Sequence, residues 1–279
     1  MRNFILTIFF ILLAGIPVAS ADDIPKVAII MDDMGYRATD VDAFSLPAHI
    51  TFAILPHTNQ STQFARRADA QGRTVMLHLP METLQPRELG PGAVFSSMTA
   101  SQLTQTLERA LESVPTATGV NNHMGSKLTQ LSFPMTTLMQ ALSERDLFFV
   151  DSRTTRFSKA AKIAKTVGVP ALQRRVFLDH KIEEAFIDEQ FARLIRLANK
   201  YGYAVGIAHP HPLTVKRLTY LLDGEHSVEF VSVSTLMASV QPDHERQFAV
   251  TEKANASPVQ EAGYSPLEAP SSVDISSQQ

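Results

Sequence analysis

Two adjacent carboxylates follow an apolar run near the start of the chain. The run over residues 26–31 reads KVAIIM, and Asp32 and Asp33 come directly after it. Each carboxylate raises the free-energy cost of ionising its neighbour, so such a pair at the end of a buried strand calls for a compensating charge. A divalent cation supplies that charge, because one carboxylate can bind the ion while the other stays ionised beside water that the ion activates.

Asp and His residues also gather where five later apolar runs end. These ends read HLPME from His78, NNHMGS from Asn121, DSRT from Asp151, DH from Asp179 and HPHP from His209. Ordinary loops would carry a mixture of Lys, Ser, Asn and Glu, whereas five of the nine histidines lie at these ends. Imidazole and carboxylate ligands suit Zn²⁺ in an open site with three protein ligands and one water, and they also suit Co²⁺, Ni²⁺ or Mn²⁺.

The polar run ends need a scaffold that brings them together. Short apolar runs alternate with helical patterns, which is typical of a parallel sheet covered on both faces. We expect strands over residues 27–31, 50–55, 74–79, 119–122, 147–150, 171–178, 204–208 and 228–233, and helices over 59–70, 99–111, 133–144, 158–167, 187–201 and 212–222. Seven or eight repeats favour an α/β fold with a distorted (β/α) barrel of parallel strands, and an open doubly wound sheet is the alternative. In such a barrel the strand ends meet at the C-terminal rim, where barrel enzymes place their chemistry.

The two ends of the chain differ from its middle. Residues 1–21 combine one basic residue, an apolar run and the small residues Ala-Ser-Ala at 19–21, the pattern of a cleaved export signal; an uncleaved anchor is the alternative. From 241 to 279, apolar periodicity gives way to Pro, Ser, Glu, Gln and Ala, which predicts a disordered tail. Residues 22–240 remain as one α/β domain.

Composition and charge agree with an exported globular protein. The chain is 44% hydrophobic and 19% charged, and its formal net charge of -3 gives no reason to expect nucleic acid or an anionic membrane as a partner. It has no cysteine, which excludes disulfides, thiolate metal sites and cysteine nucleophiles. We expect a periplasmic or secreted protein with no stable membrane insertion once the signal is removed.

The ordered motifs resemble the divergent polysaccharide deacetylase family. They are KVAIIMDDMGY, HLPME, GVNNHMGS, FFVDSRT, RRVFLD and AVGIAHPHP, and they lie between residues 24 and 240. The resemblance implies a polysaccharide-deacetylase-like barrel and a remote relation to metal-dependent carbohydrate esterases. It also implies export and a substrate such as a peptidoglycan-like glycan or another polysaccharide.

The esterase pattern implies roles for the first residues of the site. Asp32 corresponds to the catalytic base, Asp33 to a metal ligand and His78 to a second ligand. The esterases carry another histidine four residues after His78, where this chain has Glu82. The third ligand is therefore Glu82 or His123, and we prefer His123 because it restores an imidazole.

Two further esterase motifs imply the remaining roles. A histidine on the seventh strand acts as general acid, which His209 or His211 matches, and we assign the role to His209. The esterases' arginine loop is replaced by residues 122–126, so the arginine role falls to Arg153 or Arg175 and oxyanion binding to backbone N–H groups of this loop. Residues expected to bind substrate or support the ligands are Glu82, Asn122, Asp151, Arg153 and His211.

Three functions follow from these alternatives. The first is an exported metal-dependent hydrolase that removes N- or O-acetyl groups from an envelope or extracellular polysaccharide, with Asp32 as base and His209 as acid. The second is an inactive barrel that binds a glycan or an envelope protein partner, which the changes in the second and third motifs favour. The third is glycosidic cleavage without metal by Asp32, Asp151 and Asp179, whose carboxyl groups should then lie roughly 5–9 Å apart.

Overall fold

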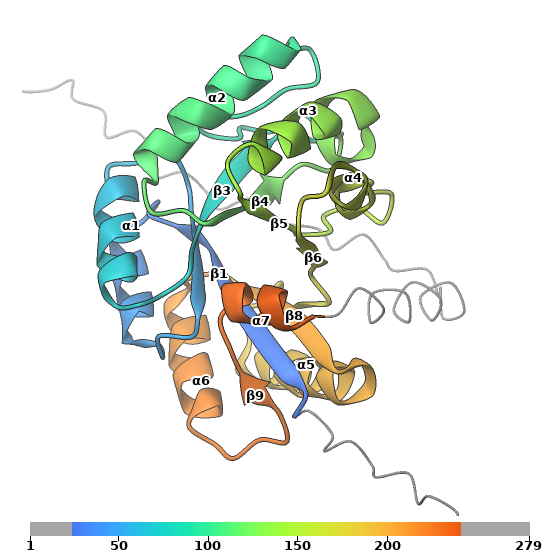
Figure 1. Ribbon diagram of the computed structural model, residues 1–279. Coiled ribbons are helices and arrows are strands. Elements are labelled where there is room, and N and C mark those ends of the chain that lie inside the picture. Colours follow the sequence, from blue (N-terminus) through green and yellow to red (C-terminus); the bar gives the residue numbers. More distant parts are fainter. Residues whose placement is uncertain (1–23, 241–279) are drawn as a thin grey trace, which may run out of the picture.

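A curled parallel sheet surrounded by helices forms the body of the protein (Figure 1). The computed structural model describes residues 24–240, so the predicted signal at 1–21 and the predicted tail at 241–279 lie outside the described residues. The strands are β1 (Lys26–Met34), β2 (Thr51–Ile54), β3 (Val75–Met81), β4 (Gly119–Met124), β5 (Phe148–Asp151), β6 (Ala171–Gln173), β7 (Val176–Phe177), β8 (Tyr203–Ala208) and β9 (Glu229–Phe230). Their hydrogen-bonded order is β6-β5-β4-β3-β2-β1-β8-β7, with β9 added beside β1. The predicted distorted (β/α) barrel is confirmed, although the sheet is only partly closed by hydrogen bonds.

Helices follow the strands as the sequence predicts. They are α1 (Ser61–Ala70), α2 (Ala100–Ser113), α3 (Ser132–Ser143), α4 (Ala160–Val167), α5 (Glu184–Tyr201), α6 (Pro212–Leu222) and α7 (Val233–Ser239), with 3-10 segments η1 (Ala38–Ser45) and η2 (Leu128–Gln130). Every expected helix is present, and α7 and the 3-10 segments are additional. Within residues 24–240, no helix combines the length and the apolar character needed to cross a membrane.

The expected strand over 171–178 is two short strands. β6 pairs with β5, whereas β7 pairs with β8 at the other edge of the sheet. Between them the Arg174 N–H donates to the Asp151 carbonyl at 2.9 Å, and the Arg175 N–H donates to the Val205 carbonyl at 2.8 Å. The chain therefore crosses from one sheet edge to the other within two residues, and a single continuous strand cannot form there.

Alternate strand residues face two separate apolar cores. On β1, Val27 and Ile29 pack with the outer helices, whereas Ala28 and Ile30 belong to a second cluster with residues of the other strands. This second cluster is the inner core of the barrel. Burial on both faces explains why the strands read as continuous apolar runs rather than as alternating patterns.

Helix α7 covers one end of the inner core. Its buried residues Val233 and Leu236 belong to the inner cluster. The Val233 N–H donates to Thr51 Oγ1 at 3.0 Å, at the start of β2. Figure 1 shows α7 across the middle of the ring of strands, while α1 to α6 lie around its outside. Because Thr51 begins β2, α7 closes the N-terminal end and leaves the C-terminal rim to the polar run ends.

Candidate metal centre

A bulge at the end of β1 directs two neighbouring carboxylates to one place. Successive side chains of a strand point to opposite faces, so Asp32 and Asp33 would normally diverge. The pairing of β1 with β2 shifts register between Met31 and Met34, and Asp33 has a φ of 57° in the left-handed region. As a result both carboxylates approach His78 Nε2, Asp32 Oδ2 at 3.7 Å and Asp33 Oδ1 at 3.0 Å.

Asp33 near the end of β1, His78 in the middle of β3 and His123 near the end of β4 converge. Asp33 Oδ1 lies 3.0 Å from His78 Nε2 and 2.9 Å from His123 Nδ1, and the two ring nitrogens are 3.2 Å apart. Met124 and Gly125 follow His123 with φ values of 53° and 89°, so two consecutive left-handed residues turn the chain sharply at the rim. The structure thus brings together the three residues predicted as ligands.

The convergence of the three atoms fits a divalent cation. Asp33 Oδ1 is buried and receives no well-aligned hydrogen bond from the described residues, although two ring nitrogens lie within 3.0 Å of it. Ligand atoms about 2 Å from a tetrahedral ion lie about 3.3 Å from each other, close to the observed spacings. One carboxylate and two imidazoles also leave a fourth position for water, as in open zinc sites.

Burial and neighbouring charges separate the pKa values of the two carboxylates. Burial raises the pKa of Asp32, and the charges of His78 and His209 offset only part of that rise. Burial acts on Asp33 as well, but His123 and His78 outweigh it and hold the pKa of Asp33 well below its usual range. A ligand must be ionised and a base must accept a proton near the working pH, so the environments favour Asp33 as ligand and Asp32 as base.

His209 lies beside the cluster on the turn between β8 and α6. Its Nε2 is 3.9 Å from Asp33 Oδ2, and its Nδ1 is 3.0 Å from Asp179 Oδ1. Asp179 Oδ2 accepts hydrogen bonds from the His209 N–H at 2.7 Å and the Thr214 hydroxyl at 3.0 Å. Burial lowers the pKa of His209, but the charge and hydrogen bond of Asp179 outweigh it and raise the pKa to about 9. The raised pKa favours the protonated form of His209 at neutral pH, which is the form that can donate a proton.

Glu82 lies outside the ligand cluster. One carboxylate oxygen is 2.6 Å from Lys127 Nζ, and the other accepts a hydrogen bond from the Ser96 N–H at 2.7 Å. Burial opposes ionisation, but the hydrogen bonds from Lys127 and Ser96 lower the pKa of Glu82. Glu82 ties the long loop after β3 to the loop after β4, and of the two alternatives for the third ligand the structure brings His123 to the cluster.

Asn122 and Asp151 support loops rather than the cluster. Asn122 Oδ1 accepts a hydrogen bond from the Ser152 N–H at 2.9 Å, and its Nδ2 donates to the Met124 carbonyl at 2.7 Å. Asp151 Oδ1 accepts from the Arg153 N–H at 2.8 Å and Oδ2 from the Ser158 hydroxyl at 2.7 Å. Asp151 lies on the strand face of the outer-core residue Phe149, whereas Asp32 lies on the face of the inner-core residue Ile30. These two carboxylates of the triplet expected for glycosidic cleavage therefore lie on different faces of the sheet.

His211 and Arg153 lie at the rim. His211 Nδ1 is 3.4 Å from Arg37 Nη1, and burial lowers the pKa of His211. Arg153 has a φ of 50°, and its carbonyl accepts a hydrogen bond from Arg174 Nη2 at 2.8 Å. Their roles in substrate binding, like the arginine role considered for Arg153 or Arg175, stay predictions.

Two residues of the site have roles that the sequence did not indicate. Asn121 Nδ2 donates to Asp32 Oδ1 at 2.7 Å, and Asn121 Oδ1 lies 2.8 Å from His78 Nδ1. Asp179 orients His209 rather than serving as one of three hydrolytic carboxylates. The spacing could have indicated Asn121, because residues two positions apart on a strand lie on the same face and Asn121 is two positions before His123.

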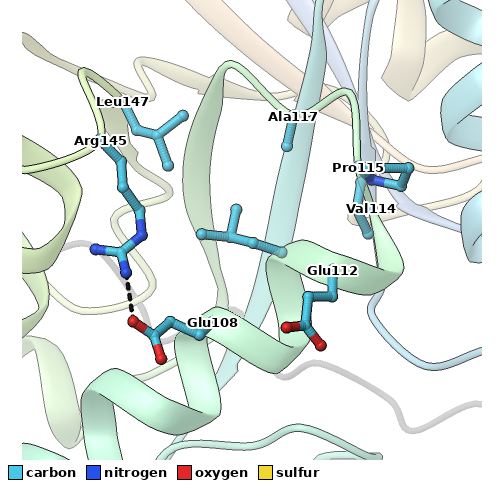
Figure 2. Close-up of a pocket in the computed structure, with 8 residues that line it drawn as sticks. Glu108, Glu112, Val114, Pro115, Ala117, Arg145 and Leu147 are labelled. Carbon is cyan, nitrogen blue, oxygen red and sulfur yellow. Dashed lines mark hydrogen bonds and ion pairs between the residues drawn. The ribbon is translucent and has the colours of Figure 1, made fainter.

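A pocket of about 390 Å³ lies away from this cluster (Figure 2). Its lining residues are Glu108, Leu111, Glu112, Val114, Pro115, Ala117, Arg145 and Leu147. Figure 2 shows Arg145 directed at Glu108, with which it forms an ion pair. The lining residues end α2 or precede β4 and β5, at the N-terminal end of the barrel, so the pocket is not part of the candidate metal centre.

The fold and the cluster together define a class: parallel (β/α) barrels with a candidate metal centre of one carboxylate and two imidazoles at the C-terminal rim. Within that class, this chain belongs to the divergent polysaccharide deacetylase family, which it matches over residues 29–237. The resemblance predicted from the motifs is thereby confirmed.

Two relatives and one solved structure are similar to this chain. It is 36% identical over 220 residues to the uncharacterized protein YibQ of Escherichia coli K12, covering 78% of this chain and 69% of YibQ. It is 40% identical over 191 residues to an uncharacterized protein of Haemophilus influenzae, covering 68% of each chain. The crystal structure of the uncharacterized protein ATU2773 from Agrobacterium tumefaciens C58 matches with a TM-score of 0.74 at 24% identity, over 78% of this chain and 91% of that one. This match supports the fold.

Proposed function

We propose that this protein is a metal-dependent hydrolase that removes acetyl groups from a polysaccharide. The observation that carries the proposal is the convergence of Asp33, His78 and His123 on one point, with Asp32 and His209 beside it. Membership of the divergent polysaccharide deacetylase family supports a glycan substrate. A peptidoglycan-like glycan or an extracellular polysaccharide fits the export that residues 1–21 predict.

The chain's own residues divide the proton transfers between them. A divalent cation held by Asp33, His78 and His123, for which Zn²⁺ is our first choice, supplies Lewis-acid chemistry to water and to an acyl carbonyl. Asp32 takes a proton from the water that adds to the acyl carbon. His209 Nε2–H gives a proton to the sugar nitrogen or oxygen as its bond to the acyl carbon breaks, so acetate and a free amine or hydroxyl result. Asp179 holds the other ring nitrogen and keeps His209 charged before the transfer.

The second candidate function is an inactive barrel that binds a glycan or an envelope protein partner. The sequence favours this alternative because Glu82 stands where the esterases have a second histidine. In the structure His123 stands with Asp33 and His78, while Glu82 pairs with Lys127. The change at Glu82 therefore leaves a set of three ligand atoms, and the hydrolase remains our choice.

Metal content tests the proposal first. The purified protein should hold or regain close to one equivalent of Zn²⁺ or Co²⁺ by elemental analysis, and Asp33→Ala and His78→Ala should hold little. Glu82→Gln is the matched control, because Glu82 lies outside the cluster and its variant should keep the metal. A folded parent protein that neither retains nor regains metal would contradict the proposed function.

Acetate release tests the chemistry. Acetylated chitooligosaccharides, acetylated xylan and purified peptidoglycan should be screened with the metal-loaded protein. Asp32→Asn should keep the metal and lose activity by about 10²–10⁴-fold, the usual contribution of a positioned general base. Full activity in Asp32→Asn would exclude Asp32 as the base.

We also propose that the protein is exported, with cleavage after Ala21. The support is the sequence pattern of residues 1–21. Fractionation of the producing cell and N-terminal sequencing of the mature protein test this. A chain that keeps Met1 and stays in the cytoplasm would contradict it.

A further inference from the structure

One buried amide connects the proposed base to a proposed metal ligand. Asn121 on β4 is fully buried. Its Nδ2 donates to Asp32 Oδ1 at 2.7 Å, its Oδ1 lies 2.8 Å from His78 Nδ1, and Ser152 Oγ is 3.4 Å from the same Nδ2. A single side chain thus contacts both Asp32 and His78, which are themselves 3.7 Å apart.

The chemistry of the three groups determines the direction of both hydrogen bonds. An ionised carboxylate only accepts, so the amide must present its NH₂ to Asp32 and its oxygen to His78. The amide oxygen also only accepts, so His78 Nδ1 must carry the proton. The other ring nitrogen, Nε2, then has its lone pair free toward Asp33 and His123. A flipped amide would place two acceptors against each other and leave two donors facing.

The sheet itself holds Asn121 in this place. β3 and β4 pair in parallel register, with His78 opposite Asn121 and Pro80 opposite His123. Asn121 and His123 lie two residues apart, and so face the same side of β4. The β3–β4 ladder therefore delivers one ligand, its hydrogen-bond partner and a second ligand to the same edge of the barrel.

We propose that Asn121 is a positioning residue that couples cation binding to the proton transfer. It keeps His78 in the tautomer whose Nε2 can bind a cation, and it holds Asp32 beside the cluster without adding a charge. The half of the proposal that concerns His78 needs only cation binding. The half that concerns Asp32 rests on the proposed hydrolase function.

Two substitutions at Asn121 separate these halves. Asn121→Ala removes both hydrogen bonds, so Co²⁺ affinity should fall by about 10–100-fold, as is usual when the hydrogen-bond partner of a ligand histidine is lost. Asn121→Asp keeps an acceptor for His78 but places a second carboxylate against Asp32. It should bind Co²⁺ at least as tightly as the parent and lose acetate release by about 100-fold or more.

Asn199→Ala is the control, because Asn199 lies near the end of α5 and its Nδ2 donates to Ser227 Oγ at 2.8 Å rather than to a residue of the cluster. It should leave the Co²⁺ affinity and the visible Co²⁺ spectrum unchanged. Parent-like Co²⁺ affinity and spectrum in Asn121→Ala would overturn the proposal. Equal losses of affinity in Asn121→Ala and Asn199→Ala would overturn it as well, since the effect would then come from a general loss of stability.

A measurement on the unaltered protein decides the tautomer even if the variants fail to fold. In the Zn²⁺-loaded protein with ¹⁵N-labelled histidine, His78 should be bound through Nε2 and show a slowly exchanging Nδ1 proton. Coordination through Nδ1, or rapid exchange of that proton, would overturn the proposal. A protein that binds Co²⁺ but releases no acetate would contradict the proposed function alone, because the affinities still decide what Asn121 does for His78.

Discussion

Asp32 and Asp33 are chemically identical neighbours with different surroundings. The left-handed φ of Asp33 brings its carboxylate within 3.0 Å of His78 and His123 ring nitrogens. Asp32 instead lies 3.7 Å from His78 Nε2 and accepts a hydrogen bond from the neutral amide of Asn121. Burial acts on both carboxylates and raises the pKa of Asp32, whereas at Asp33 the histidines outweigh burial and lower the pKa. The proposed ligand and the proposed base therefore have different electrostatic environments although they are neighbours in the chain.

The interaction of Asp179 with His209 predicts how the free energy of unfolding depends on pH. The pKa of His209 in the folded protein is about 9, above its ordinary value of about 6.5. A group with a raised folded pKa stabilises the fold fully below its unfolded pKa and loses that contribution as the pH rises through the folded pKa. In the metal-free protein, the free energy of unfolding should therefore fall by about 1–3 kcal/mol between about pH 6.5 and 9.

Asp179→Asn should flatten this dependence, because it removes the charge that raises the pKa of His209. Urea unfolding of the metal-free protein at a series of pH values measures the slope. Asp188→Asn is the control, since Asp188 pairs with Arg217 on the surface away from His209. A slope in Asp179→Asn that matches the parent would assign the pH dependence to other groups.

The loop that follows β4 determines where His123 lies. Gly125 has a φ of 89°, and a Cβ added there would lie 2.9 Å from Met81 Cβ. Gly168, at the end of α4, has a similar φ of 91° but open space around it. Alanine at either position should cost about 1–2 kcal/mol through the left-handed backbone, but only Gly125→Ala has a close contact to relieve.

We therefore expect Gly125→Ala to weaken Zn²⁺ binding and Gly168→Ala to leave it unchanged. Gly125→Ala moves the turn that carries His123, so its thermal midpoint should fall further than that of Gly168→Ala. Isothermal titration with Zn²⁺ and thermal melts of both variants provide the comparison. Equal Zn²⁺ affinities in the two variants would show that the turn does not position His123.

The sequence predicts where strands occur better than it predicts which side chains of a strand face the inner core. Apolar runs predicted where strands occur, because burial on both faces demands them, but one run was expected as a single strand where β6 and β7 form. The same double burial hides which side chains point inward, so the sequence did not indicate Asn121, although it contacts Asp32 and His78. The bulge at Asp33 and the break at Arg174 depend on hydrogen bonds to distant strands, so no local pattern marks them.

The start of α7, near the end of the described chain, could have been predicted from the sequence. The run over 228–233 was expected as one strand, but β9 ends at Phe230 and α7 begins at Val233. Ser232 Oγ accepts a hydrogen bond from the Thr235 N–H at 3.2 Å. Serine is a preferred residue immediately before a helix, and that preference marks the start of α7.

At the scale of the whole molecule, α7 contributes to the inner core although it lies last in the described chain. Leu236 is fully buried in the inner cluster. Leu236→Ala should therefore lower the free energy of unfolding by about 2–5 kcal/mol, the range for a leucine deleted from a packed core. Ala238→Ser, on the exposed side of the same helix, should stay within about 0.5 kcal/mol of the parent. Similar small effects of both changes in urea unfolding would mean that the barrel does not need α7.

The chain crosses at Arg174 and Arg175 between the two edge strands of the sheet, β6 and β7, which are not neighbours in the hydrogen-bonded order. We call this boundary between β6 and β7 the seam. Strands β6 and β7 are edge strands on its two sides, whereas β1 and β8 are paired on both sides. Backbone amides of β6 and β7 should therefore exchange with solvent deuterium before those of β1 and β8, as measured by native-state hydrogen exchange. Equal protection across the four strands would mean that the seam is as stable as the ladders.

The residues of the site lie at different distances from the seam along the sheet. The strands that carry Asp33, His78 and His123 lie in the middle of the sheet, while β7 and β8 lead to Asp179 and His209 at its edge. A parting of the seam would therefore displace Asp179 and His209 before Asp33, His78 and His123, because the first two follow β7 and β8 at the edge of the sheet. If these residues act as we propose, a bulky chain could enter beside the acid while the three ligands keep their positions.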